Sequence, residues 1–142
     1  METSDSEIAN FLLDFIPDAM RVIRDEMRAA SSAELTFPQF RIFRKLARQT
    51  CTSHELADWM GVSRPTVSKM IDILEVRGLI KKGINKADKR HIPLELTDKG
   101  KTLFRSIRGT VQKKIATRMA SLKVSEKKSI TESMSRLAEV LR

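Results

Sequence analysis

Two short helical patterns lie in residues 53–78, which read SHELADWMGVSRPTVSKMIDILEVRG. The first pattern ends at Gly61, a residue type that is favoured where a helix stops with positive φ. Ser63 is placed to cap the second helix, and Pro65 falls in its first turn, where a missing N–H costs nothing. The buried stripe of the second helix is predicted to contain Val67, Met70, Ile71 and Leu74. The stretch therefore predicts two helices joined by a tight turn.

Such a pair is a candidate helix-turn-helix, in which the second helix enters the major groove of DNA with its first turns against the bases. Arg64 can donate two hydrogen bonds to guanine, and the Thr66 methyl group suits thymine. The helix N-terminus also favours a phosphate. The predicted DNA-binding residues here are Ser63, Arg64, Pro65, Thr66, Ser68 and Lys69. The alternative is a helical hairpin with a solvated polar face.

The segment that follows changes from helical to alternating periodicity. Residues 79–84 and 91–96 predict two strands, and Pro93 cannot donate a ladder hydrogen bond in the second. The intervening tip carries Lys86, Lys89 and Arg90. A basic β-ribbon beside a recognition helix can reach an adjacent minor groove, where arginine is attracted by the negative potential. The alternative is a solvated hairpin with an Asp88–Arg90 pair.

The remainder of the chain is predicted to be helical. Residues 6–28 carry apolar side chains at three- and four-residue spacing, which is typical of an amphipathic helix. Thr36 with Gln39 and Thr52 with Glu55 form capping boxes, and Thr97 begins a long helix. A last helix is predicted after a fresh cap at Ser125. We expect the stripes at the two chain ends to pack on each other and on a second subunit.

Composition excludes several classes of protein. The chain has 142 residues, the size of one domain, and a formal charge of +9, which points to an anionic partner. A single cysteine permits no internal disulfide and no cysteine-based zinc site. An acidic N-terminus without the basic region of a signal peptide fits a cytoplasmic setting. We expect no enzyme activity, cofactor or metal, because no nucleophile–base pair, phosphate loop or ligand cluster is present.

Several motifs together resemble the MarR family of transcriptional regulators. They are Glu55-Leu56-Ala57, Gly61-Val62-Ser63, Thr66-Val67-Ser68-Lys69, Ile71-Asp72-Ile73-Leu74-Glu75, Arg77-Gly78-Leu79-Ile80, Asp88-Lys89-Arg90 and Leu96-Thr97-Asp98-Lys99-Gly100. The resemblance implies a mainly α fold, a winged helix-turn-helix with a two-stranded β-wing and dimerisation helices at both chain ends. We expect one domain over 1–142, with a DNA-binding lobe at about 35–97 and dimerisation helices at about 6–30 and 98–142.

The resemblance also implies a homodimer that binds a pseudo-palindromic operator. Arg90 is then either a minor-groove contact or the partner of Asp72, and Asp72 and Asp88 are predicted to brace the wing. An effector crevice is implied between the dimerisation helices and the DNA-binding lobe. Its predicted walls are Phe11, Phe15, Phe37, Phe40, Phe43 and Trp59. These walls and the positive charge suit an aromatic compound, including an anionic one.

The sequence thus predicts a DNA-binding repressor that a small molecule releases. The alternative function is a winged-helix module for protein or RNA partners without operator specificity. Thiol sensing is not expected, because Cys51 lies in the loop before the third helix and the chain has no tyrosine. Cys51 is instead expected to be a small buried or loop residue.

Overall fold

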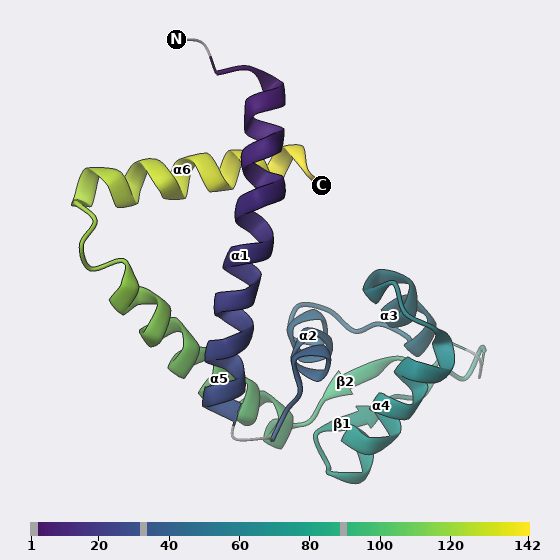
Figure 1. Cartoon of the computed structure of the whole chain (residues 1–142). Coiled ribbons are helices and arrows are strands. Elements are labelled where there is room, and N and C mark those ends of the chain that lie inside the picture. Colours follow the sequence, from purple (N-terminus) through teal and green to yellow (C-terminus); the bar gives the residue numbers. More distant parts are fainter. Residues whose placement is uncertain (1–2, 32–33, 89–90) are drawn as a thin grey trace.

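The computed structural model describes residues 3–31, 34–88 and 91–142, and Figure 1 shows the path of the chain. Six helices and two strands follow one another, in an order that matches the prediction from the sequence. They are α1 (Asp5–Ser31), α2 (Phe37–Leu46), α3 (Ser53–Met60), α4 (Arg64–Val76), β1 (Ile80–Lys82), β2 (Leu94–Leu96), α5 (Asp98–Arg118) and α6 (Val124–Val140).

Each of the helices α2 to α5 begins with a hydroxyl side chain that accepts a backbone N–H three residues further on. This contact satisfies one of the donors that a helix start leaves without a partner. The pairs and their distances are Thr36–Gln39 at 3.3 Å, Thr52–Glu55 at 3.2 Å, Ser63–Thr66 at 3.3 Å and Thr97–Gly100 at 3.0 Å. The predicted capping boxes and caps are therefore confirmed. Gly61 ends α3 at φ 68°, the left-handed conformation that its position predicted.

The predicted cap at Ser125 is wrong. The N-cap of α6 is Lys123, and Ser125 lies inside the first turn. The Lys123 backbone N–H donates to Glu126 Oε2 at 2.6 Å, so the carboxylate replaces the hydroxyl as the capping group. Glu126 caps the helix from its position three residues after Lys123. If Ser125 were the cap, Glu126 would instead be the first helical residue.

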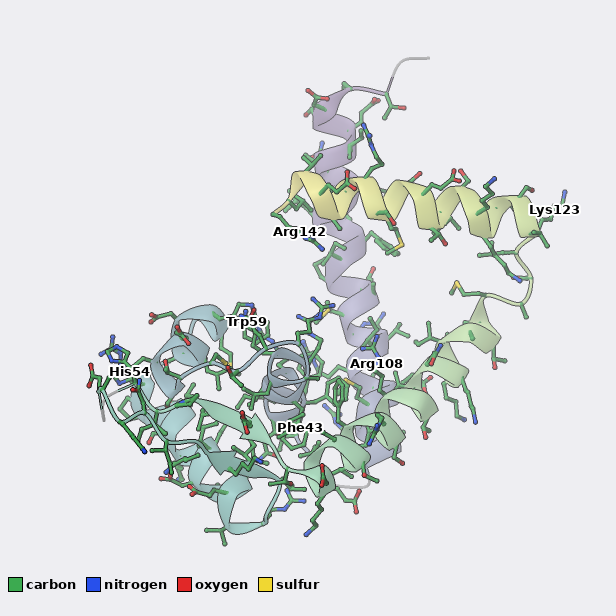
Figure 2. The ribbon with its side chains drawn as sticks, turned by 180° about the vertical axis from the view of Figure 1, so that it is seen from behind. Phe43, His54, Trp59, Arg108, Lys123 and Arg142 are labelled. Carbon is green, nitrogen blue, oxygen red and sulfur yellow. The ribbon has the colours of Figure 1, made fainter. Side chains whose placement is uncertain are left out.

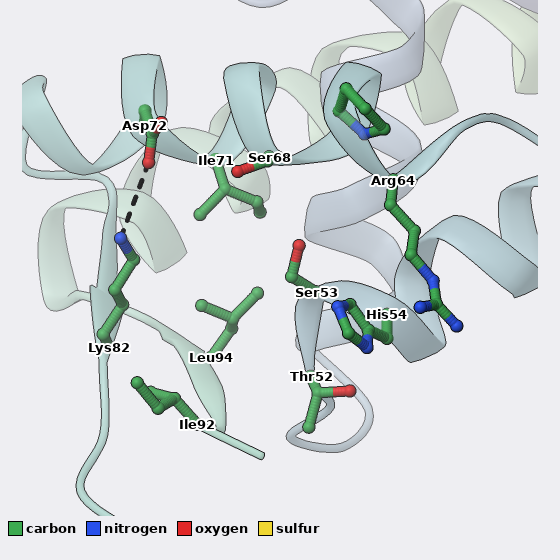
Figure 3. Close-up of a pocket in the computed structure, with 11 residues that line it drawn as sticks. Thr52, Ser53, His54, Arg64, Ser68, Ile71, Asp72, Lys82, Ile92 and Leu94 are labelled. Carbon is green, nitrogen blue, oxygen red and sulfur yellow. Dashed lines mark hydrogen bonds and ion pairs between the residues drawn. The ribbon is translucent and has the colours of Figure 1, made fainter. Parts of the chain in front are cut away.

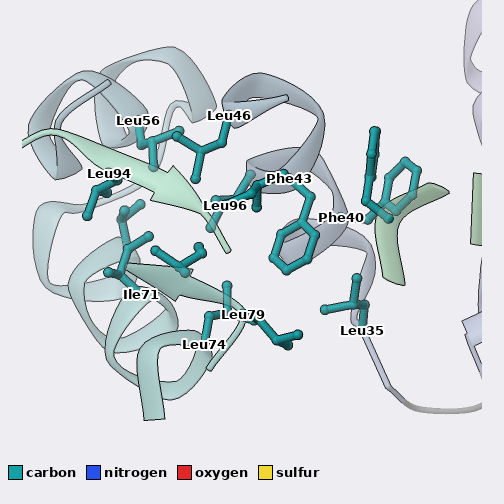
Figure 4. Packing of buried hydrophobic residues seen from close by; sticks show 14 of the residues in the cluster. Leu35, Phe40, Phe43, Leu46, Leu56, Ile71, Leu74, Leu79, Leu94 and Leu96 are labelled. Carbon is teal, nitrogen blue, oxygen red and sulfur yellow. The ribbon is translucent and has the colours of Figure 1, made fainter. Parts of the chain in front are cut away.

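One hydrophobic core joins the winged helix to the start of α5 and the end of α1. Figure 4 shows this packing. Phe43 and Leu56 are fully buried at its centre, and Phe40 lies 5.0 Å from Phe104 of α5, measured between ring centroids. Three of the four predicted stripe residues of α4 are buried, namely Val67, Ile71 and Leu74, and Met70 is half-buried. Helix α4 is thus held by a core that extends into α1 and α5.

The wing is shorter than the sequence predicted. Its antiparallel strands pair Ile80 with Leu96 and Lys82 with Leu94, and each strand has only three residues. Pro93 explains the early end of the ladder, because it has no N–H to donate, although its carbonyl still accepts from Gly83 N at 2.7 Å. Beyond that point the chain leaves the ladder and forms the wing loop.

The junction between β2 and α5 is tightly packed. The Thr97 hydroxyl donates to the Gly78 carbonyl at 2.6 Å while it also caps α5, and Thr97 N donates to the Leu79 carbonyl at 3.1 Å. Gly100 lies so close that a Cβ added there would be 2.1 Å from the same Leu79 oxygen. Only glycine fits this contact, which fixes the direction of α5 relative to the wing.

The chain-end helices expose much of their apolar surface. We expected the two terminal stripes to pack on each other. Within one subunit, however, α6 has no buried residue. The large apolar side chains left exposed on α1 and α6 include Ile8, Phe11, Phe15, Ile16, Ile130 and Met134. Within the described ranges, no helix combines the length and apolar character needed to cross a membrane.

Candidate nucleic-acid interface

The N-terminal turns of α4 present a polar, cationic surface. All six residues that the sequence proposed for this surface, from Ser63 to Lys69, are exposed. Ser63 and Thr66 place their hydroxyl oxygens 2.7 Å apart, so their side chains are fixed while they cap the helix. Arg64 and Lys69 flank them, and neither has an ion pair among the described residues. The surface therefore offers cations and hydroxyls at a helix N-terminus, which suits an anionic partner.

Lys82 of β1 ties the wing to the recognition helix. Its Nζ lies 2.9 Å from Glu75 Oε2 and 3.5 Å from Asp72 Oδ1, both on α4. The predicted bracing carboxylate, Asp72, thus contacts a wing cation, although that cation is Lys82. The alternative partner Arg90 lies outside the described residues. The hydrogen bond that the Lys82 ammonium donates to Glu75 raises the pKa of that ammonium, while burial opposes the shift.

This contact predicts a modest, pH-dependent contribution to wing docking. Because the pKa of Lys82 is raised on folding, its stabilisation is complete below the free lysine's pKa and is lost as the pH rises through the folded value. The side chains are exposed, so Lys82→Gln is expected to cost about 0.2–1 kcal/mol near neutral pH. Thermal unfolding should show this difference unchanged from pH 6 to 9 and vanishing in stronger alkali. A difference that persists there would exclude the ionic origin.

The wing loop is organised by Asn85, which the sequence analysis did not single out. Its Oδ1 accepts from Ala87 N at 3.1 Å and from Asp88 N at 3.2 Å, and its Nδ2 donates to the His91 carbonyl at 3.0 Å. An asparagine that bonds to the backbone two residues on is a recognised turn signal. Asp88 Oδ2 lies 2.7 Å from His91 Nδ1 and accepts a hydrogen bond from it in the tautomer that carries the proton on that nitrogen.

The predicted wing cations divide into two groups. Lys86 is exposed in the loop, whereas Lys89 and Arg90 lie outside the described residues.

A hollow of about 390 Å³ separates the wing from the helix-turn-helix (Figure 3). Polar side chains from both sides line it above an apolar floor, and they include Ser53, His54, Arg64, Ser68, Asp72 and Lys82. His54 is a further polar group on this face, and its place at the start of α3 is the signal that could have found it.

A second concentration of positive charge lies on α2 and α5, away from α4. Three cations surround the ring of Trp59, and their distances from its centroid are 5.2 Å for Arg41, 5.7 Å for Arg44 and 5.3 Å for Lys45. Cations at this range are attracted by the negative face of the ring. The sequence analysis missed this arrangement, although the spacing of basic residues along α2 contains it.

Comparison with known proteins agrees with this geometry. Residues 35–92, which hold the helix-turn-helix and most of the wing, match the model of the MarR family. The HTH-type transcriptional regulator YfiV of Bacillus subtilis is 26% identical over 109 residues, 76% of this chain and 68% of that protein. Residues 35–92 are a MarR-type winged helix-turn-helix.

Solved MarR structures extend the likeness over the whole fold. A MarR family protein from Bacillus stearothermophilus is 18% identical, covers 99% of both chains and has a TM-score of 0.81. The Mycobacterium tuberculosis MarR family protein Rv2887, solved in complex with salicylic acid, is 22% identical, with coverage of 96% and 97% and a TM-score of 0.69. The MarR winged helix and its flanking helices are therefore the fold of this protein, and the family consists of transcriptional regulators.

The six aromatic residues proposed as effector walls have surroundings that differ from one another. Phe40 and Phe43 are buried in the core. Phe11 and Phe15 stack on each other at 5.4 Å on the exposed half of α1, where they are 63% and 44% exposed. Trp59 lies among the cations of α2.

Phe37 is the member of this set that borders a hollow between α1 and α2. Arg24 lies 5.3 Å from the centre of its ring. The hollow measures about 530 Å³ and combines arginines with apolar walls, its residues including Arg24, Met27, Arg28, Leu35, Phe37 and Pro38. It opens where α1 meets α2, the first helix of the winged-helix lobe.

Cys51 is buried and 4% exposed, as the sequence predicted. Its backbone carbonyl accepts from Leu94 N at 2.9 Å, so the residue forms part of the edge of the wing. Burial, assisted by the nearby Glu55 carboxylate, raises the pKa of the Cys51 thiol. A raised pKa disfavours the thiolate, which is the reactive form. Cys51 therefore has the surroundings of a structural residue.

Proposed function

We propose that the protein is a homodimeric repressor that binds a pseudo-palindromic operator and is released by a small aromatic anion. The observation that supports this most directly is the exposed, hydroxyl-capped N-terminus of α4 beside a braced, basic wing. In this proposal α4 enters the major groove and the wing follows the adjacent minor groove. The residues proposed to contact DNA are Ser63, Arg64, Pro65, Thr66, Ser68, Lys69, Lys86, Lys89 and Arg90.

The proposed dimer follows from the unburied surfaces of α1 and α6. Phe11 is 63% exposed and Met134 is 56% exposed, and α6 buries none of its residues. A contiguous apolar surface of this kind is typical of a protein–protein contact. An isologous dimer would cover both helices with the same pair of surfaces. Two recognition helices would then meet half-sites about one helical turn apart, roughly 34–36 Å.

The effector is proposed to bind in the hollow between α1 and α2. Its arginines suit a carboxylate, and Phe37 with its apolar neighbours suits an aromatic ring. The complex of Rv2887 with salicylic acid supports this class of compound. A ligand here weakens operator binding only if it binds better to the non-binding arrangement of lobe and dimerisation helices, and DNA must then weaken the ligand equally.

Two substitutions on α4 test the DNA contacts. Arg64→Ala is expected to relax sequence preference at one operator position and to cost about 1–3 kcal/mol, as for a lost bidentate base contact. Lys69→Ala is expected to weaken all duplexes alike and to lower the salt slope by about one per subunit, as for a phosphate contact. Selection from a random duplex pool followed by titration would measure both. Two variants that bind like the parent would remove α4 from the interface.

The effector site has its own test. Salicylate is the probe, and its affinity is measured by calorimetry with and without the selected operator. Arg24→Met keeps the aliphatic contact with Phe37 and removes the charge, so it is expected to weaken salicylate about tenfold or more. Operator affinity without salicylate should stay at the parent value. Salicylate binding that leaves operator affinity unchanged would show that the hollow does not control release.

A further inference from the structure

The cations around Trp59 belong to a larger group, which we call the basic cluster. Its members are Arg41, Arg44, Lys45, Arg48 and Arg108. In the described part of the chain, none of these five side chains forms an ion pair. Figure 2 shows Trp59 at the edge of the lobe and Arg108 on α5. The basic cluster thus gathers five cations that have no ion-pair partner among the described residues of their own subunit.

Mutual repulsion acts within the basic cluster. Burial lowers the pKa of the Arg44 guanidinium, and the charges of Arg48, Arg41 and Arg108 lower it further. No carboxylate contributes in the opposite direction. An arginine stays charged under all physiological conditions, so the group cannot relieve this repulsion by losing a proton. A carboxylate partner would relieve it.

The matching surface lies on the first half of α1. Residues 5–20 contain four carboxylates and no lysine or arginine. Three of the carboxylates, Glu7, Asp14 and Asp18, share one side of the helix with Phe11, because the steps from 7 to 11, 14 and 18 are four, three and four. We call this side, together with the adjoining Phe15, the acidic face.

Among the described residues, the carboxylates of the acidic face pair only within their own end of the chain, and Glu7 accepts from the Ser4 backbone N–H at 2.8 Å. Phe11 and Phe15 stack on each other in the open, and Asp18 contacts only its helical neighbour Arg21, at 3.6 Å, with both side chains mostly exposed. Figure 1 shows this half of α1 extending away from the lobe, whereas the basic cluster lies on α2 and α5. One surface combines aromatic rings with carboxylates, and the other combines an aromatic ring with cations.

We infer that in the dimer the acidic face of one subunit lies against the basic cluster of its partner. This inference rests on the homodimer proposed above. An isologous dimer makes the contact twice, so one complementary pair of surfaces gives two neutralised clusters. The contact joins α1 of one subunit directly to the DNA-binding lobe of the other, and it therefore fixes the position of each recognition helix relative to the dimer frame.

A charge-swap experiment tests the inference in the full chain. One variant reverses the acidic face (Asp14→Lys with Asp18→Lys), a second reverses the basic cluster (Arg41→Glu with Arg44→Glu), and a third carries all four changes. Sedimentation velocity over a dilution series gives the dimer dissociation constant. Each two-residue variant is expected to raise the dimer dissociation constant about tenfold or more. The variant with all four substitutions is expected to restore that constant to within about threefold of the parent's. These differences should shrink at high salt, because the charges lie at the surface.

A matched control carries the same charge change on the opposite side of the lobe. Lys69→Glu with Lys86→Glu should keep the parent's dimer dissociation constant, and circular dichroism should show that every variant remains folded. If the variant with all four substitutions dimerises no more tightly than the two-residue variants, the pairing of these two surfaces is wrong, although the proposed dimer is not excluded. If cluster reversal instead weakens random duplex and leaves the dimer unchanged, the cluster contacts DNA and the inference is overturned. A parent protein that is monomeric at micromolar concentration would overturn the proposed dimer itself.

Discussion

Leu137→Glu is expected to convert the protein into a folded monomer that binds a full operator about 10²–10⁴-fold more weakly than the parent, because a monomer holds only one half-site at a time. Leu137 continues the apolar face of α6, which carries Ile130, Met134, Leu137 and Leu141. Since α6 buries none of its residues within one subunit, a charge there removes the dimer contact without opening the core of the lobe.

Three measurements on the same sample separate these effects. Light scattering reports the mass, thermal unfolding reports the stability of the lobe, and titration reports affinity for one half-site and for two. Ser135→Glu is the matched control, because it adds the same charge on the opposite, polar face of α6 beside Glu132 and Glu139. That control should remain dimeric. A Leu137→Glu protein that stays dimeric with full operator affinity would exclude α6 from the interface.

Gly100→Ala is expected to destabilise the fold by about 3 kcal/mol, near the upper end of the usual cost of overpacking. The added Cβ would lie 2.1 Å from the Leu79 carbonyl oxygen, and that oxygen is already held by Thr97 N. Both groups are backbone, so neither can rotate away as a side chain would. The start of α5 and the end of α4 would have to separate.

The control for this substitution lies in the same helix. Gly109 has no atom within 4 Å of an added Cβ, so Gly109→Ala is expected to stabilise α5 by about 0.5–1 kcal/mol. Chemical denaturation of both variants gives the comparison. Equal stabilities would show that the Leu79–Gly100 contact yields easily, and the direction of α5 would then have another origin.

Local rules predicted the beginnings of the helices well. Thr36, Thr52, Ser63 and Thr97 cap the helices that their positions indicated, because a cap depends only on residues three apart. The error at Ser125 came from residue type alone, because serine is a common cap, whereas the capping carboxylate Glu126 lies three residues after Lys123 and not after Ser125. The early end of the wing strands follows from Pro93, although their length of three residues was not predicted.

Tertiary relations were harder to predict from the sequence. Phe37, Phe40 and Phe43 occur at helical spacing, and only the packing of α5 decides that Phe40 and Phe43 are core while Phe37 borders a hollow. The sequence indicated Asp72 as a bracing residue, but its contact with Lys82 depends on how β1 meets α4. The basic cluster adds Arg108 of α5 to cations of α2 and the turn after it, and the ring that they surround comes from α3, so no single stretch of sequence contains the whole arrangement.

The isolated position of α6 has a consequence for dosage in the cell. Because a subunit folds its DNA-binding lobe without α6, the proposed dimer can separate and re-form while each subunit stays folded. At concentrations below the dimer dissociation constant, the number of complete operator-binding units then varies with the square of the subunit concentration. Halving the subunit concentration would leave about a quarter of the operator-binding units, so genes under the proposed regulator would respond to dilution more steeply than in proportion.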